Sequence, residues 1–243
     1  MQYGRRAVAA VAGALVLIAL GATPRAAHAV VPGQIDDFES GSVLNWQNST
    51  TVLDPPPDPP PHPGVARNIA TGGPAGADDN FLRIGSTGAG AGGKLVVFNL
   101  AQWTGNYLAQ GVNGISMHVR NEGDTDLTLR LILVKAQFVE ALCTVEGVVL
   151  DADDDGWQLV TFPLTAANLT GGDFNSVMSG VTELNLVHSP TAITHRQQSP
   201  NYVAQLGFDN VTALPVPEPA SAGAAGAAVL FAALRRGRRR AGG

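Results

Sequence analysis

The acidic run from Asp151 to Asp155 comes closest in this sequence to the spacing of a known metal-binding loop. With the glycine that follows it reads Asp-Ala-Asp-Asp-Asp-Gly, the first half of an EF-hand loop, in which alternate side-chain oxygens bind Ca²⁺. Phe162 stands where that loop requires its bidentate glutamate, and residues 157–162 have the pattern of a strand instead of a helix. We therefore interpret the run as an acidic turn, or a weak cation site, and not as an EF-hand.

The residue patterns of a catalytic centre are missing from the sequence. It contains no G-x-S-x-G, no H-E-x-x-H and no glycine-rich phosphate loop. Four histidines stand singly, without the spacing of metal ligands: His62, His118, His188 and His195. The single cysteine, Cys143, lies in the apolar context Ala-Leu-Cys-Thr-Val, which predicts a small buried residue. The sequence thus favours a protein that is not an enzyme, and a hydrolase of unrecognised type remains the alternative.

Aromatic rings are the side chains that could offer a sugar a flat surface for stacking. The candidates are Trp46, Trp103, Trp157, Tyr107 and Tyr202. Trp103 and Tyr107 lie in a polar segment that contains a glycine, so we predict a ligand-binding site at this pair, with anchoring in the core as the alternative. Trp157 begins a strand and is expected to pack in the core.

Strands must position these side chains, because the middle of the chain alternates with a period of two residues. Within residues 125–134 leucines occupy one face of a predicted strand: Leu127, Leu129, Leu131 and Leu133. Residues 114–120 alternate similarly, and the Asn-Glu-Gly-Asp turn at 121–124 predicts a hairpin between the two strands. Further strands are expected at 156–164, 181–188 and 204–214, with a helical turn near 165–169. The pattern predicts an all-β domain over residues 30–214, a single β-sandwich.

Proline and glycine mark the predicted loops of this domain. Residues 54–63 hold seven prolines and are expected to form an exposed, extended loop. Residues 71–80 and 86–93 are rich in glycine and alanine and are expected to be loops as well.

The central domain is strongly acidic. Of the 15 Lys and Arg, only 7 lie between the two terminal segments, whereas 19 of the 20 Asp and Glu lie there, which gives a net charge of −12. Such a domain repels nucleic acid and anionic lipid, so we exclude nucleic-acid binding, and it attracts divalent cations.

The N-terminus has the order of regions found in a secretory signal peptide. Arg5 and Arg6 precede an apolar run over 7–20, and Ala27-His28-Ala29 is a small-residue cleavage site. The run is shorter than the roughly 20 residues of a full membrane span. We predict a signal peptide over residues 1–29 that signal peptidase removes after Ala29.

The C-terminal residues 215–243 form a second segment outside the predicted domain. Prolines from Pro215 to Pro219 predict an extended spacer, and residues 220–234 predict a short transmembrane helix of marginal hydrophobicity. A basic cluster follows: Arg235, Arg236, Arg238, Arg239 and Arg240. Because such a cluster stays in the cytoplasm, the acidic domain is expected on the outer side of the inner membrane.

This tail resembles the PEP-CTERM sorting signal of Gram-negative bacteria, and Pro217, Glu218 and Pro219 carry the likeness together with the apolar helix and the arginines. The resemblance implies that an exosortase, a membrane protease, recognises the Pro-Glu-Pro motif and removes the tail. It also implies a protein that is transiently associated with the inner membrane and is then delivered to the cell surface or the medium. Bacteria with this system commonly make exopolysaccharide.

The order of motifs in the domain resembles the galactose-binding-like jelly rolls of carbohydrate-binding modules. The likeness rests on Asp-Asp-Phe-Glu at 36–39, Asp-Asn-Phe-Leu-Arg-Ile at 79–84, Gly-Trp-Gln-Leu-Val at 156–160 and Phe-Asp-Asn-Val at 208–211. In that family a structural Ca²⁺ often ties the first strand to the last. The resemblance therefore implies a calcium site at Asp37, Glu39 and Asp209, with simple acidic strand ends as the alternative.

Three hypotheses follow for the function. The main one is an exported, exosortase-processed surface or extracellular-matrix protein, without catalytic activity, associated with exopolysaccharide. The alternative is a carbohydrate-binding module that uses Trp103 and Tyr107. The hydrolase of unrecognised type is the third.

Overall fold

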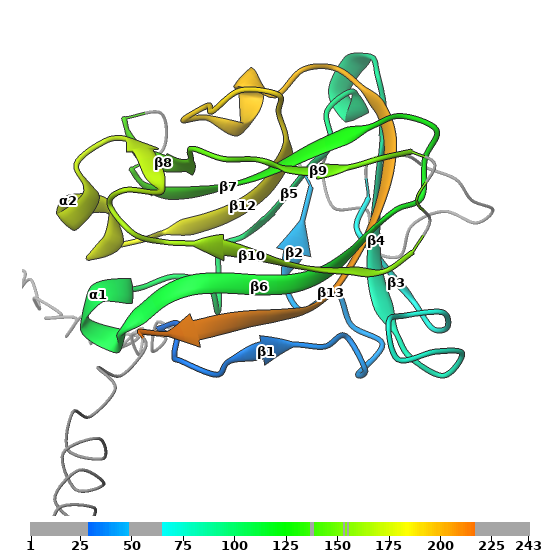
Figure 1. Ribbon diagram of the computed structural model, residues 1–243, viewed down its shortest axis with the longest axis horizontal. Coiled ribbons are helices and arrows are strands. Elements are labelled where there is room, and N and C mark those ends of the chain that lie inside the picture. The colour runs from blue at the N-terminus through cyan, green and yellow to red at the C-terminus, as the bar shows by residue number, and fades with distance from the viewer. Residues whose placement is uncertain (1–28, 49–64, 137–138, 153, 155, 217–243) are drawn as a thin grey trace, which may run out of the picture.

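The long strands place their alternate apolar side chains against one shared core. The computed structural model describes residues 29–48, 65–136, 139–152, 154 and 156–216. Within them, two antiparallel sheets pack face to face, and one continuous cluster of buried residues fills the space between them (Figure 1). This arrangement confirms the predicted all-β class and the single β-sandwich.

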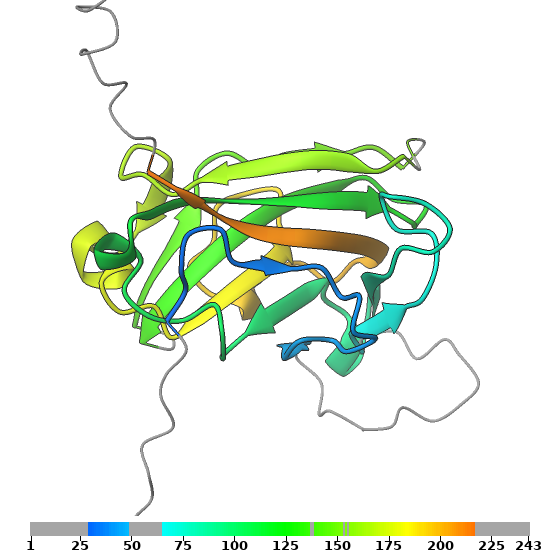
Figure 2. The same ribbon diagram turned by 90° about the horizontal axis from the view of Figure 1, so that it is seen from below.

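The first sheet has six strands among the described residues, in the order β10-β6-β13-β4-β3, and β1 pairs with β13. Its strands are β1 (Ile35–Asp36), β3 (Arg67–Ile69), β4 (Phe81–Thr87), β6 (Val112–Asn121), β10 (Gln158–Pro163) and β13 (Val203–Pro215). Pairing of β1 with β13 brings the beginning and the end of the domain side by side (Figure 2).

The second sheet has seven strands in the described part of the chain, in the order β11-β8-β7-β12-β5-β2, and β9 pairs with β7. Its strands are β2 (Trp46–Gln47), β5 (Val96–Asn99), β7 (Leu127–Ala136), β8 (Glu140–Thr144), β9 (Val148–Leu150), β11 (Leu169–Gly171) and β12 (Glu183–His188). The strands expected at 156–164, 181–188 and 204–214 are thus confirmed as β10, β12 and β13.

Helical structure is limited to short pieces. Two single-turn α-helices, α1 (Tyr107–Gln110) and α2 (Phe174–Met178), have polar N-caps, because Asn106 and Asp173 accept hydrogen bonds from backbone N–H groups of the first turn. Two 3₁₀ turns are η1 (Gly90–Gly92) and η2 (Arg196–Gln198). The expected turn near 165–169 is present, where the Asn168 N–H donates to the Thr165 carbonyl.

The predicted hairpin between residues 114–120 and 125–134 is wrong. These residues belong to β6 and β7, which lie in different sheets: β6 pairs with β10 and β13, whereas β7 pairs with β8, β9 and β12. Both strands alternate because both face the same core, from opposite sides. The turn between them crosses from one sheet to the other, and the Asn121 side chain shapes it by donating to the Thr125 carbonyl and accepting from the Gly123 N–H.

A second, smaller apolar cluster lies on the outer face of the second sheet. It comprises Val96, Phe98, Ile132, Val134, Ala141, Cys143 and Val187, with Ile193 packed on it. Ile193 belongs to the connection between β12 and β13, residues 189–202, so this connection covers the outer face as a strap. Cys143 is buried there, as predicted.

Several predicted segments lie outside the described residues. They are residues 1–28 of the signal peptide predicted over 1–29, the proline-rich loop 54–63, and residues 217–243 of the tail predicted over 215–243. In the part of the chain that the structure describes, no helix has the length and hydrophobicity needed to span a membrane.

Candidate functional site

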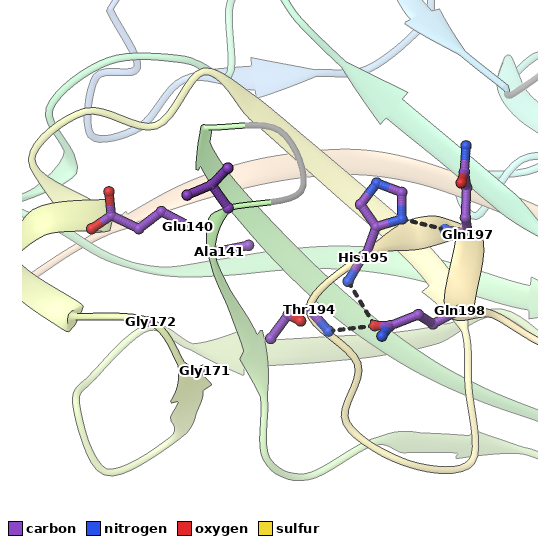
Figure 3. Close-up of a pocket in the computed structure, with 9 residues that line it drawn as sticks. Glu140, Ala141, Gly171, Gly172, Thr194, His195, Gln197 and Gln198 are labelled. Carbon is purple, nitrogen blue, oxygen red and sulfur yellow. Dashed lines mark hydrogen bonds between the residues drawn. The ribbon is translucent and has the colours of Figure 1, made fainter.

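An open pocket lies at one edge of the second sheet, where β8, β11 and the strap meet. Its volume is about 610 Å³, which is in the range of small-molecule sites. It is lined by Val139, Glu140, Ala141, Gly171, Gly172, Thr194, His195, Gln197 and Gln198 (Figure 3). Three segments that are distant in the sequence therefore build it.

Two consecutive glycines allow these segments to approach closely. Gly171 has φ of +128°, and a Cβ atom there would lie 2.5 Å from the Ala141 carbonyl oxygen and 2.9 Å from Cγ2 of Thr194. Gly172 donates its N–H to the same carbonyl at 2.8 Å. A side chain at position 171 would therefore push the strap away from β8.

The wall of the pocket is held by a capping box around η2. The N–H groups of Thr194 and His195 both donate to Oε1 of Gln198, at 3.1 Å each. Nδ1 of His195 accepts the N–H of Gln197 at 3.1 Å, so the neutral ring carries its proton on Nε2. Burial lowers the pKa of His195, the positive charge of Arg196 lowers it further, and Glu183 opposes the shift. The imidazole is therefore neutral at pH 7.

Buried charges fix the strap to the sheet behind this wall. Arg196 forms an ion pair with Glu183, which is buried, and its guanidinium lies over the Phe98 ring at 4.2 Å. Arg130 is also buried, and its guanidinium joins the end of β8 to the strap. It donates to the carbonyl oxygens of Thr144 and Val145 on the β8 side and of Ser189 and Pro190 on the strap. The strap is thereby a fixed part of the domain, and the wall of the pocket is preformed.

The lining suits a neutral, hydroxyl-rich ligand better than a reaction. The side chains of Thr194, Gln197 and Gln198 offer hydrogen-bond donors and acceptors without charge. Figure 3 shows the two titratable side chains, Glu140 and His195, on different sides of the pocket and pointing away from each other. Glu140 pairs with Lys135 at 3.4 Å. Among the residues that line the pocket there is no Phe, Tyr or Trp.

The predicted ligand-binding pair at Trp103 and Tyr107 is wrong. Both side chains have an exposed fraction of 0 %, and the Tyr107 hydroxyl donates to the Trp103 carbonyl. The reason is Asp36, whose Oδ2 accepts the indole N–H of both Trp46 and Trp103, at 2.7 Å each. The buried carboxylate thus satisfies both indoles inside the sandwich, and the polar character of the segment around Trp103 did not reveal it.

Trp157, which the sequence analysis expected in the core, lies at the surface instead. It is half-buried on the outer face of the first sheet, where it packs edge-to-face on Phe81 at 5.2 Å between centroids. The Arg120 guanidinium lies over its ring at 4.7 Å, and its indole N–H donates to the Gly72 carbonyl. Gly207 lies beneath both rings, since a Cβ there would be 3.1 Å from each. These contacts hold the Trp157 ring against the surface of the first sheet.

Of the predicted calcium ligands, Asp37 and Glu39 lie just after β1, and Asp209 lies on β13, the strand with which β1 pairs. Asp209 is fully buried, and its Oδ1 has no hydrogen-bond partner. Burial raises the pKa of Asp209 to about 7, and the negative charges of Asp79, Glu39 and Asp37 add to the shift. Tertiary structure therefore brings the three predicted residues into electrostatic range and adds Asp79, which sequence reasoning missed.

The donor set fits a cation only in part. An orphaned, buried carboxylate oxygen among like charges is the environment that a Ca²⁺ ion would relieve. However, no three Asp, Glu, His or Cys side chains of the described residues converge as ligands. Glu39 and Asp79 instead accept backbone N–H groups, from Asn80 and Ala75. The calcium site stays a prediction.

Two other predicted features can be placed only partly. The acidic turn precedes strand β10, as predicted, and Oδ1 of Asp154 accepts the Gly156 N–H, whereas Asp153 and Asp155 lie outside the described residues. The sorting motif Pro217, Glu218 and Pro219 and the basic cluster Arg235–Arg240 also lie outside them.

Comparison with known proteins shows a likeness of fold. No protein-family model matches the sequence, and no curated protein matches it. A structure described as an exo-β-agarase superposes with a TM-score of 0.50 and 13 % identity over 78 % of this chain and 26 % of that one, so this chain spans about a quarter of its length. A family 11 carbohydrate-binding module from Clostridium thermocellum, in complex with a β-1,3-1,4-mixed-linked tetrasaccharide, gives 0.45 and 13 % over 76 % and 97 % of the two chains. A family 30 carbohydrate-binding module gives 0.41 and 17 % over 79 % and 90 %. At these identities the likeness is one of fold alone: a two-sheet β-sandwich.

Proposed function

We propose that this domain binds a neutral polysaccharide in the pocket between β8, β11 and the strap, without catalysing a reaction on it. The observation that carries the proposal is the lining itself. It combines uncharged hydrogen-bonding side chains with a rigid glycine floor in a volume of about 610 Å³. Neutral amides and hydroxyls match sugar hydroxyl groups, and a preformed wall lowers the entropy that binding costs.

The arrangement of titratable groups supports binding over catalysis. A glycosidase needs two carboxyl groups that flank the scissile bond, about 5 to 10 Å apart. Glu140 is the one carboxylate of the lining, and Lys135 compensates its charge. The hydrolase remains the competing hypothesis, and release of reducing ends from a polysaccharide that the protein binds would establish it.

Titration calorimetry of the purified protein with soluble polysaccharides tests the proposal. We would use agarose oligosaccharides, mixed-linked β-glucan and a charged control such as polygalacturonate. Gln197→Ala is the informative variant, because the Gln197 side chain is exposed and lines the pocket. Its removal breaks no side-chain hydrogen bond among the described residues, so the fold should be unaffected. We expect it to weaken binding about tenfold, equivalent to about one hydrogen bond to the ligand.

Gln110→Ala is the matched control, since this glutamine is also exposed but lies on α1, away from the pocket. It should leave the affinity unchanged. Equal affinities for wild type and Gln197→Ala, or no heat with any neutral polysaccharide, would exclude the pocket as a glycan site.

We also propose that the protein is exported and sorted to the cell surface by removal of its tail. The support is the sequence pattern of both terminal segments. Mass spectrometry of the protein from its native host should find no peptide from the basic cluster Arg235–Arg240. Recovery of intact tail as the dominant form would contradict exosortase processing.

The remaining part of the proposal is a structural Ca²⁺ at Asp209. Carboxylates of Asp37, Glu39 and Asp79 would supply the charge, and the ion would relieve the buried carboxylate. Because a ligand that binds only the folded state stabilises it, millimolar Ca²⁺ should raise the melting temperature. An identical melting temperature with chelator and with Ca²⁺ would exclude the site.

A further inference from the structure

The segments around α1, at one end of the sandwich, carry no charged side chain, although the domain as a whole is acidic. Three sequence segments meet there, residues 29–35, 95–117 and 211–216, and they contain no Asp, Glu, Lys or Arg. Both ends of the described chain are fixed to the α1 region: the Val30 N–H donates to the Thr104 carbonyl, and the Val216 N–H donates to the Gly111 carbonyl. Helix α1 lies between these two attachments, at the same end of the molecule in both views (Figures 1 and 2).

Apolar side chains project into solvent around this helix. Val31, Leu108 and Val216 have exposed fractions of 46, 43 and 52 %. Leu108 lies on α1, Val216 is bonded to Gly111, and Val31 follows Val30, which is bonded to Thr104. Apolar residues also flank it on β1 and after β5, where Ile35 and Leu100 are about half exposed. We call the set of Val31, Leu108 and Val216 the apolar end.

The neighbouring segment adds little charge to the apolar end. Residues 156–172 are also uncharged, and the Leu164 N–H donates to the Asn113 carbonyl, which joins this segment to the start of β6. Helix α2 contacts α1 and carries Asp173 as its N-cap, where the carboxylate is engaged with the Ser176 N–H. Among the described residues, the other charged side chains at this end are Lys135 and Glu140 on the α2 side, and these two pair with each other.

The chain that follows Val216 indicates what would cover the apolar end. Ala220 opens the predicted membrane helix, four residues further on. Because a fully extended chain spans at most about 3.6 Å per residue, four residues allow at most about 14 Å between Val216 and the start of a helix at that position. A domain held this close to a bilayer must present one face to it, and the segments beside the tether carry no charged side chain.

We infer that the apolar end is a lipid-contacting surface, on which the domain rests against the outer leaflet while its tail is intact. The inference rests on the membrane helix proposed for residues 220–234 and is independent of glycan binding. Uncharged, half-exposed aliphatic side chains enter the interfacial region of a bilayer, whereas the acidic remainder of the domain is repelled by anionic lipid. The orientation directs the opposite end of β13, at Val203, away from the membrane.

Site-directed fluorescence on residues 30–243, the chain without its predicted signal peptide, in phosphatidylcholine vesicles tests this inference. Leu108→Cys carries the label at the apolar end, and Val203→Cys is the matched control, because Val203 is 65 % exposed at the far end of β13. The native Cys143 is buried and should not react, which the labelled wild type checks. Aqueous iodide and lipids brominated in their acyl chains serve as the two quenchers.

We expect iodide to quench the label at position 108 at least threefold less than the label at 203, and brominated lipid to quench only the former. Equal quenching at the two positions, in a chain that co-floats with vesicles, would overturn the orientation alone. Protection from iodide without quenching by brominated lipid would show that another protein copy covers the surface, which also overturns it. A chain that does not co-float would refute the proposed membrane helix and this surface with it, whereas glycan binding would stand. Val31→Cys repeats the measurement should Leu108→Cys not fold.

Discussion

The substitution Asp209→Asn tests how much the buried charge of Asp209 destabilises the folded domain. The side chain has an exposed fraction of 0 %, and one of its carboxylate oxygens has no partner. Asparagine has nearly the same shape and no charge. We therefore expect the variant to be more stable than the wild type at pH 8 in the presence of a chelator, which is unusual for a buried polar substitution.

The magnitude follows from the pKa of Asp209. It is about 7 in the folded protein, compared with 3.8 for an unperturbed aspartate, and each unit corresponds to about 1.36 kcal/mol. The folded state therefore binds more protons than the unfolded state between about pH 4 and pH 7. Stability consequently falls as the pH rises through this window and levels off above it, with a total loss of up to about 4 kcal/mol.

Urea unfolding at pH 5, 6, 7 and 8, with chelator throughout, measures this loss. The wild type should lose stability with rising pH relative to Asp209→Asn, and the difference between the two proteins should grow to about 2 to 4 kcal/mol at pH 8. Parallel pH profiles for the two proteins would refute the assignment of the charge to Asp209. Repeating the series with Ca²⁺ should reverse the order if the ion binds, because only the wild type can supply the carboxylate.

Three further changes test the site and its support. Gly171→Ala should destabilise the domain by about 2 kcal/mol or more, because its Cβ would lie 2.5 Å from the Ala141 carbonyl oxygen. Gly33→Ala, with φ of +79° and nothing within 4 Å, should cost only about 1 kcal/mol, so thermal unfolding of the two variants separates the effect of the clash from that of backbone strain. Arg130→Met should cost about 3 kcal/mol in urea unfolding, since it removes the charged donor that four buried or half-buried carbonyls share, and a cost below 1 kcal/mol would show that the strap holds without it. Burial raises the pKa of the Cys143 thiol, so a thiol reagent at pH 8 should react with it only on unfolding, and rapid reaction in the folded protein would contradict the packing of the strap.

Features of the fold that depend on local periodicity were predictable. The alternation at Leu127 to Leu133 identified β7, and the other predicted strands of the second half were found within a few residues. The hairpin of β6 and β7 was not predictable, because alternation shows which residues face a core and not from which side. A turn of four polar residues serves equally well within a sheet and between two sheets.

The candidate site was predictable only in fragments. His195 and Gly171 carry no recognisable spacing in the sequence, since the pocket arises where three distant segments meet. The polar, glycine-containing segment around Trp103 and Tyr107 predicted a surface site. Asp36 instead supplies the acceptor that allows the indoles of Trp46 and Trp103 to lie in the core. The hydrogen bonds from both indoles to Asp36 are contacts between distant parts of the chain, which local sequence does not reveal.

The sequence by itself determined the strand periodicity, the acidity of the domain and the distinct character of its two terminal segments, because each is a property of neighbouring residues and their composition. Only the tertiary structure decided which side chains meet. It placed Asp209 among three other carboxylates, laid the strap over the second sheet, and gathered three uncharged segments beside α1. The physical reason is that burial, electrostatic coupling and close approach depend on distances in space, which strand pairing sets between residues far apart in the chain.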